Sequence, residues 1–190
     1  MVKVGIVLLI SVAFANVAFE PASQVMTQET IDMINNNPGT KWQASKSWVG
    51  DMTVDEAKAY LGTDLSVPNP FPKRNFGALH DYLSVPDSFD SRTQWPDCIH
   101  PIRNQERCGS CWAFSASEVL SDRFCIAKNV NVVLSPQWLV SCDNNNLGCN
   151  GGNLPLVWQY MESTGIPTDT CDPYISGGGD SHTGSCSHGC

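Results

Sequence analysis

The pattern of hydrophobic and polar positions changes sharply near the start of the chain. Lys3 precedes an apolar run at positions 4–10, and Ala13 and Ala15 follow with one residue between them. A basic residue, a short apolar stretch and two spaced small residues are typical of a signal peptide, and the run is too short to span a bilayer. The pattern predicts a signal peptide over residues 1–15 and entry of the remaining chain into the secretory route.

Two stretches of the polar region that follows have apolar residues at helical spacing. One helix is predicted over residues 28–35, behind a possible N-cap at Thr27. A second is predicted from Thr53, with Glu56 as its capping-box partner and an apolar side that extends to Leu61.

A Pro-rich stretch, VPNPFPKR, occupies residues 67–74. Proline lacks the backbone N–H and pushes the residue before it toward extended geometry, which excludes a helix here. The stretch predicts an exposed linker of the kind that proteases cut.

The longest amphipathic stretch begins at Cys111. Small and apolar residues recur there at steps of three and four, and we expect them on the buried face of a helix: Ala113, Ala116, Leu120, Phe124 and Ala127. Cys111 then lies at the helix N-terminus, where free N–H groups and the helix dipole stabilise an anion. Position alone makes its thiolate a candidate nucleophile.

The residues before Cys111 fit the same chemistry. Gly109 and Ser110 provide a tight, open turn, and Gln105 lies six residues upstream of the thiol. Its side-chain amide is positioned to donate to an oxyanion that develops beside the nucleophile. The sequence therefore predicts a nucleophile and an oxyanion donor on one loop.

Composition narrows the possible functions further. The 11 basic and 19 acidic residues give a net charge of -8, which disfavours nucleic acid and anionic membranes as partners. All nine cysteines lie at or after Cys98. In an oxidising compartment an odd count suggests four disulfides and one thiol with another role.

Residues 105–114, QERCGSCWAF, resemble the active-site signature of papain-like cysteine proteases. The resemblance extends to residues 148–152 (GCNGG), to residues 135–142 (SPQWLVSC) and to residues 85–92 (VPDSFDSR), which look like a mature N-terminus. Within the family the cathepsin B branch is the most similar, on the segments at 93–98, 171–174 and 186–190.

The resemblance implies an α+β, papain-like fold. Residues 16–84 would form a short helical propeptide, and residues 85–190 the helical left part of the catalytic domain, with the C-terminal half absent. It also implies peptide or protein substrates, the chain's own propeptide as an inhibitor, and a lysosomal, vacuolar or extracellular location. No cofactor, metal or membrane span after signal removal is expected.

Site residues follow from the same resemblance. Cys111 would be the nucleophile, and Gln105 the oxyanion-hole donor, assisted by the backbone N–H of Cys111. Gly109, Gly151 and Gly152 would line the substrate cleft. Gly152 matches the position whose backbone pairs with an extended substrate, a contact that leaves no room for a side chain.

Spacing alone leaves many cysteine pairings open. Carried over residue by residue, the family pattern implies four disulfides and leaves Cys111 unpaired: Cys98–Cys125, Cys108–Cys149, Cys142–Cys186 and Cys171–Cys190.

The family's catalytic His and Asn have no match in this sequence. Neither His80 and His100 before the thiol nor His182 and His188 near the end fit the family's His motif. We therefore expect the chain to be inactive alone. Only 14 residues separate Cys171 from Cys186, shorter than the occluding loop of cathepsin B, which predicts an endopeptidase with an open primed side.

Other interpretations remain open. Cys108 and Cys111 have the spacing of a redox pair or of half a zinc site, and a secreted, disulfide-stapled protein could bind peptides or proteases without catalysis. We expect Glu118 and Asp143 to be solvated surface carboxylates, and Trp158 to belong to the core.

Overall fold

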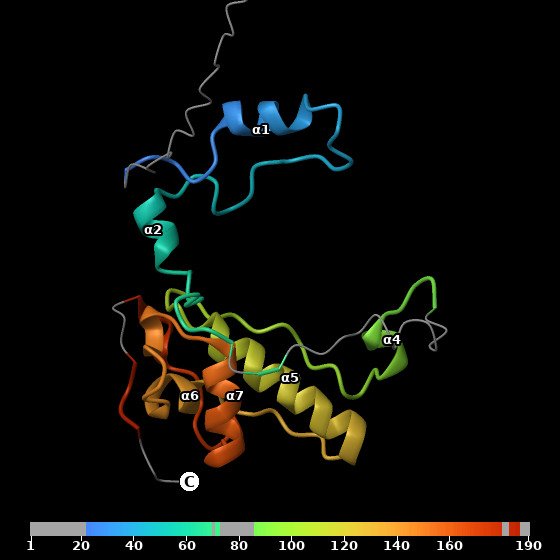
Figure 1. Cartoon of the computed structure of the whole chain (residues 1–190), viewed down its shortest axis with the longest axis vertical. Coiled ribbons are helices and arrows are strands. Elements are labelled where there is room, and N and C mark those ends of the chain that lie inside the picture. Colours follow the sequence, from blue (N-terminus) through green and yellow to red (C-terminus); the bar gives the residue numbers. More distant parts are fainter. Residues whose placement is uncertain (1–21, 70, 73–85, 180–182, 187–190) are drawn as a thin grey trace, which may run out of the picture. The chain divides into compact units, whose positions relative to one another are not determined.

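In the computed structural model, the residues described are 22–69, 71–72, 86–179 and 183–186. The predicted signal peptide therefore lies outside the described residues. The chain divides into two compact units, Met1–Val54 and Asp55–Cys190 (Figure 1).

Among the described residues of the first unit, helix α1 covers Gln28–Asn35. The hydroxyl of its N-cap, Thr27, accepts a hydrogen bond from the N–H of Thr30, as the capping pattern requires. The prediction for residues 28–35 is confirmed. Of the two apolar residues at helical spacing, Ile31 is buried.

The second predicted helix is confirmed but is shorter than expected. Helix α2 covers Val54–Lys58. After it, backbone hydrogen bonds join residues three apart in sequence, and the last of them runs from the N–H of Leu61 to the carbonyl of Lys58, at 3.0 Å. Leu61 is 68% exposed. The predicted apolar side does not reach it, because the chain becomes extended from this point.

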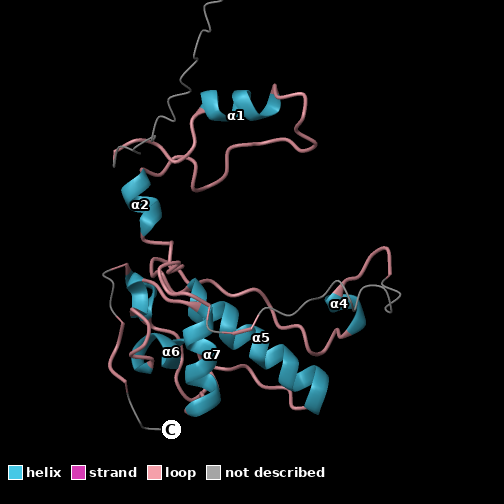
Figure 2. Cartoon of the chain, viewed as in Figure 1, coloured by secondary structure: helices cyan, strands magenta, loops and turns pink. Residues whose placement is uncertain are grey.

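The longest helices in the described part of the second unit are α5 (Cys111–Lys128), α6 (Pro136–Cys142) and α7 (Leu154–Ser163). Short elements accompany them: α4 (Ser91–Gln94), η1 (Gly148–Asn150) and η2 (Ser176–Gly178). Figure 2 shows helices joined by loops, with no strand in the part of the chain that is described. The three long helices surround one core: Cys108, Trp112, Ala113, Ala116, Leu139, Val140, Cys149, Val157 and Met161.

Helix α5 buries only the first part of the face predicted, and Leu120 is partly buried and packs against the core. Ala113 and Ala116 are buried as expected, but Phe124 is 40% exposed, and Ala127 is exposed as well. Ser117 and Ser121 are fully buried instead. Their hydroxyls donate to helix carbonyls three and four residues earlier, which satisfies these polar groups inside the core.

Disulfides staple the second unit at Cys98–Cys125, Cys108–Cys149 and Cys142–Cys186, the pairs that the family resemblance implies. Cys171 is also disulfide-bonded, and its implied partner Cys190 lies outside the described residues.

The alternative of a redox or zinc pair at Cys108 and Cys111 is wrong for this structure. Cys108 is bonded to Cys149, and Cys111 is free. In the described part of the chain, no group of three or more His, Cys, Asp or Glu side chains could hold a metal ion.

The expectation of a solvated Asp143 is also wrong. This residue is 3% exposed, and its carboxylate accepts hydrogen bonds from the N–H of Asn145 at 3.0 Å and the amide of Asn146 at 2.6 Å. Burial raises the pKa of the Asp143 carboxyl. Its role is to tie the loop that precedes η1.

Candidate active site

Cys111 lies at the first position of α5. Its neighbour Ser110 is the N-cap residue, whose carbonyl accepts from the N–H groups of Ala113 and Phe114. The disulfide of Cys108 anchors the loop just before it. The Cys111 thiol is free and partly exposed, at the end of a helix where the dipole favours a negative charge.

Gln105 is held beside the thiol by its own loop. Its side-chain amide donates to the carbonyl of Cys108 at 2.9 Å, and its main-chain carbonyl accepts from the hydroxyl of Tyr174 at 2.8 Å. Gln105 and Cys111 both line one cavity of about 390 Å³, together with Phe114. The structure therefore brings the predicted nucleophile and the predicted oxyanion donor to the same cavity.

The same amide of Gln105 also donates to the carbonyl of Tyr60, at 2.8 Å. The side-chain amide that we expect to donate to the oxyanion of a substrate therefore donates to a backbone carbonyl 45 residues away in sequence. Tyr60 is the first residue of the stretch at residues 60–67, which we call the crossing segment.

The crossing segment pairs with Gly152. The N–H of Gly152 donates to the carbonyl of Gly62 at 2.9 Å, and the N–H of Asp64 donates to the carbonyl of Gly152 at 2.8 Å. Thr63 and Gly152 form a parallel bridge. A Cβ added at Gly152 would press into the ring of Trp112, so only glycine lets the two backbones pair here.

Gly109 and Gly151, the other predicted cleft glycines, lie in the same region. Gly109 donates its N–H to the carbonyl of Cys149 at 2.8 Å, and a Cβ there would meet the carbonyl of Leu61. Gly151 is buried and has a φ of 120°, a conformation that favours glycine. Both positions keep side chains away from the crossing segment.

Thr63 is the residue of the crossing segment that reaches the thiol. Its hydroxyl lies 3.9 Å from the sulfur of Cys111. Beyond it, the side-chain amide of Asn153 donates to the carbonyls of Asp64 and Val67 at 3.0 and 3.3 Å. The crossing segment is therefore held on both sides of Cys111.

Asn153 was missed by the sequence analysis. It is the N-cap of α7, where its side-chain oxygen accepts from the N–H of Leu156, and this leaves the amide free to donate to the crossing segment. An Asn directly before a helix with a proline in its first turn is a recognisable capping signal. That signal indicates the cap, but not the second contact.

A charged cluster lies along the α5 side of the cavity. Arg103 pairs with Glu118 at 3.2 Å and with Asp169 at 2.6 Å, so Glu118 is not the solvated carboxylate that we expected. Burial raises the pKa of the Glu118 carboxyl, and the charge of Arg103 counteracts this increase.

His100 is the only histidine within the described residues, and it does not contact the thiol. Its two ring nitrogens lie 3.0 Å from the carboxylate of Asp122 and 2.8 Å from the side-chain oxygen of Asn131. His80, His182 and His188 lie outside the described residues. The described part of the chain thus offers Cys111 no hydrogen-bonded base.

Comparison with known proteins gives a consistent result. The profile of the papain family cysteine protease matches residues 85–189. The chain is 41% identical to Cathepsin B-like CP2 of Giardia intestinalis, over 74% of this chain and 47% of that protein. It is 34% identical to Cathepsin B-like protease 1 of Arabidopsis thaliana, over 85% of this chain and 49% of that protein.

Solved structures show the same fold. Procathepsin B S9 from Trypanosoma congolense superimposes with a TM-score of 0.76 at 31% identity, covering 88% of this chain and 60% of that one. A digestive procathepsin L2 from Tenebrio molitor gives 0.61 at 31% identity, over 70% and 45%. The chain spans about half the length of the curated relatives it matches. The predicted fold class is confirmed, and the chain belongs to the papain family of cysteine proteases, with cathepsin B-like proteins among its relatives.

Proposed function

We propose that this chain carries the propeptide and the nucleophile half of a cysteine endopeptidase zymogen. The observation that supports it is that Cys111 and Gln105 line the same cavity. The thiol lies at a helix N-terminus, and the amide beside it already donates to a peptide carbonyl. In the active enzyme a substrate carbonyl would take the place of the Tyr60 carbonyl.

The reaction would proceed through an acyl-enzyme. A base removes the thiol proton, and the sulfur of Cys111 bonds to the scissile carbonyl carbon. The resulting oxyanion is stabilised by the amide of Gln105 and the N–H of Cys111. The C–N bond then breaks, the amine leaves with the proton, and water releases the acyl group to regenerate the thiol.

The base and its orienting group would be a His and an Asn of the family type. We assign them to sequence equivalent to the half of the relatives that this chain does not span. His100 is an unsuitable substitute because both of its ring nitrogens are already engaged. On this proposal residues 1–190 do not hydrolyse peptides by themselves.

Residues 16–84 would act as the inhibitory propeptide, with residues 85–190 as the left part of the catalytic domain. The crossing segment fills the position that a substrate needs, since it engages Gln105, Gly152 and the surroundings of Cys111. Its parallel pairing with Gly152 supports a chain direction opposite to that of a substrate, the arrangement implied by the family.

The crossing segment has its own acid response. Hydrogen bonds from the side chain and the backbone of Ser66 lower the pKa of the Asp64 carboxyl below 3.8. A lowered pKa stabilises the folded arrangement above pH 3.8, and this contribution is lost only as the pH falls further. The family resemblance implies that the propeptide is released at acidic pH, and release at milder acidity would therefore depend on other groups.

Specificity and location complete the proposal. The loop between Cys171 and Cys186 is short, which supports an open primed side and endopeptidase action on peptides or proteins. No helix among the described residues is long and apolar enough to cross a membrane. The signal-peptide pattern supports a secretory route that ends in a lysosome, a vacuole or the extracellular space.

The test is alkylation of Cys111 by iodoacetamide, followed by peptide mass spectrometry. We expect slow alkylation of the intact chain and faster alkylation after a proteolytic cut within residues 67–74 and removal of the N-terminal piece. In the longest natural form of the protein, Cys111→Ser should abolish hydrolysis of a fluorogenic peptide amide. A bridged Cys111, an unchanged alkylation rate, or peptide binding without hydrolysis by that natural form would contradict the proposal, and the last result would favour a binding protein.

A further inference from the structure

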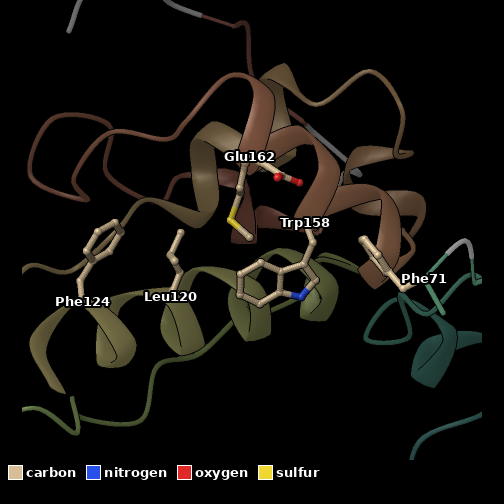
Figure 3. A pocket seen from close by; sticks show the side chains of 6 residues that line it. Phe71, Leu120, Phe124, Trp158 and Glu162 are labelled. Carbon is tan, nitrogen blue, oxygen red and sulfur yellow. The ribbon is translucent and has the colours of Figure 1, made fainter. Parts of the chain in front are cut away.

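An apolar groove lies between α5 and α7, away from Cys111. It encloses about 450 Å³ and is lined by Leu120 and Phe124 from α5, by Trp158, Met161 and Glu162 from α7, and by Phe71. Figure 3 shows Phe71 and Phe124 at opposite ends of the groove, with Trp158 between them. Trp158 is partly buried and packs against the core, as we expected, and it also lines the groove.

Hydrogen bonds fix the backbone that leads to Phe71. Asn153 holds the carbonyls of Asp64 and Val67 where the crossing segment leaves the cleft. Two residues further on, the side chain of Asn69 accepts a hydrogen bond from the N–H of Phe71 at 3.0 Å. This short turn places Phe71 at the groove. The described residues of the Pro-rich stretch are mostly exposed, as predicted for a linker.

The chemistry of the groove suits an aromatic side chain. Apart from Phe71 itself, four of its five lining residues are apolar or aromatic, and Glu162 is the one charged residue among them. Phe71 is 42% exposed, so that more than half of its surface is covered, whereas Leu65 in the crossing segment is 87% exposed. Both side chains are exposed, but the one that reaches the groove is the more covered of the two.

The sequence around Phe71 lowers the cost of docking. Phe71 stands between Pro70 and Pro72, and proline restricts the backbone before binding, so less conformational entropy is lost on binding. On the groove side, Arg123 lies over the ring of Trp158, with its guanidinium carbon 5.7 Å from the ring centre, which helps to fix the indole.

We propose that the α5/α7 groove is a docking site for Phe71 of this chain's own N-terminal region. The groove is a second anchor of the propeptide, separate from the cleft, and this inference rests on the proposed function. Two linked contacts hold a segment more tightly than either contact alone, because release of one leaves the other at high local concentration. Phe71 therefore slows departure of the crossing segment without touching the catalytic residues.

The experiment compares Phe71→Ala with Leu65→Ala in the full chain. Hydrogen–deuterium exchange of peptides that cover α7 reports on the groove, and iodoacetamide alkylation of Cys111 reports on the cleft. Phe71→Ala should increase exchange in α7 and accelerate alkylation about four- to tenfold, the change expected when half the burial of a Phe side chain is lost. Leu65→Ala should change neither, and Phe71→Leu should restore most of the protection.

The outcomes separate the two proposals. If Cys111 in the unmodified chain reacts as fast as in the chain from which the N-terminal piece has been removed, the propeptide proposal fails. If Cys111 is shielded but Phe71→Ala behaves like Leu65→Ala in both measurements, the groove proposal alone is overturned. Protection of α7 that persists in Phe71→Ala and disappears on dilution would also overturn it, because a second copy of the chain would then be the occupant.

Discussion

Substitution of Gly62 by Ala tests how closely the crossing segment is fitted to the cleft. A methyl group built at Gly62 would overlap the backbone carbonyl of Gly109. Backbone atoms cannot rotate away as a flexible side chain can, and Gly109 is itself fixed by a hydrogen bond to Cys149 and by the adjacent disulfide. The crossing segment must therefore move away from Gly152.

The magnitude follows from the contacts that this movement breaks. Two backbone hydrogen bonds join Gly152 to Gly62 and Asp64, at 2.9 and 2.8 Å. At about 0.5–1.5 kcal/mol for each bond, their loss amounts to about 1–3 kcal/mol. Because 1.4 kcal/mol corresponds to a factor of ten, the open fraction should rise about 5- to 150-fold.

The assay is the rate of Cys111 alkylation at low reagent concentration, where the rate is proportional to the open fraction. Gly39→Ala is the matched control, because the nearest atom to a Cβ at Gly39 is 3.4 Å away, an ordinary contact distance. We expect the control to react like the unmodified chain. Equal rates for Gly62→Ala and Gly39→Ala would refute the idea that the close approach at Gly62 keeps the cleft closed.

Three further substitutions test the surrounding structure. Asn153→Asp keeps an oxygen to cap α7 but removes the amide that donates to the crossing segment, so alkylation of Cys111 should accelerate while the helix content seen by circular dichroism stays unchanged. Glu118→Gln removes a carboxyl whose pKa is raised by burial. A raised pKa in the folded state weakens folding once the group ionises, so urea denaturation should show the variant gaining stability at pH 7 relative to the parent, with a smaller difference near pH 4. Ser121→Ala removes the hydroxyl that accepts a buried backbone N–H and should lower the free energy of unfolding by about 1–3 kcal/mol; Ser115→Ala, at an exposed position, should have a much smaller effect.

The Ser121 and Asn153 variants also distinguish a loss of core stability from a change in the cleft. Ser121 lies in the interior of the second unit and does not contact the crossing segment, so its substitution should affect unfolding more than the alkylation rate of Cys111 in the folded chain. Asn153 should show the opposite behaviour. A common effect on both measurements for both variants would indicate that the crossing segment and the core unfold as a single unit.

The local features of this protein could be predicted from its amino-acid sequence. Helix starts were predictable because a capping side chain and its backbone partner are only a few residues apart, as at Thr27 and Thr30. The positions of Cys111 and Gln105 on one loop were predictable for the same reason. The family motif extended this local information to pairings such as Cys98 with Cys125, which lie 27 residues apart.

Which faces and which distant segments meet became clear only from the packed chain. Phe124 has the apolar character of a core residue, yet it is exposed and lines an outer groove, while the polar side chains of Ser121 and Asp143 are buried. Asn153 reaches across 89 residues of sequence to the crossing segment. Such contacts depend on how helices pack and on where their hydrogen-bonding groups are satisfied, and neither property is encoded in the spacing of residues along one element.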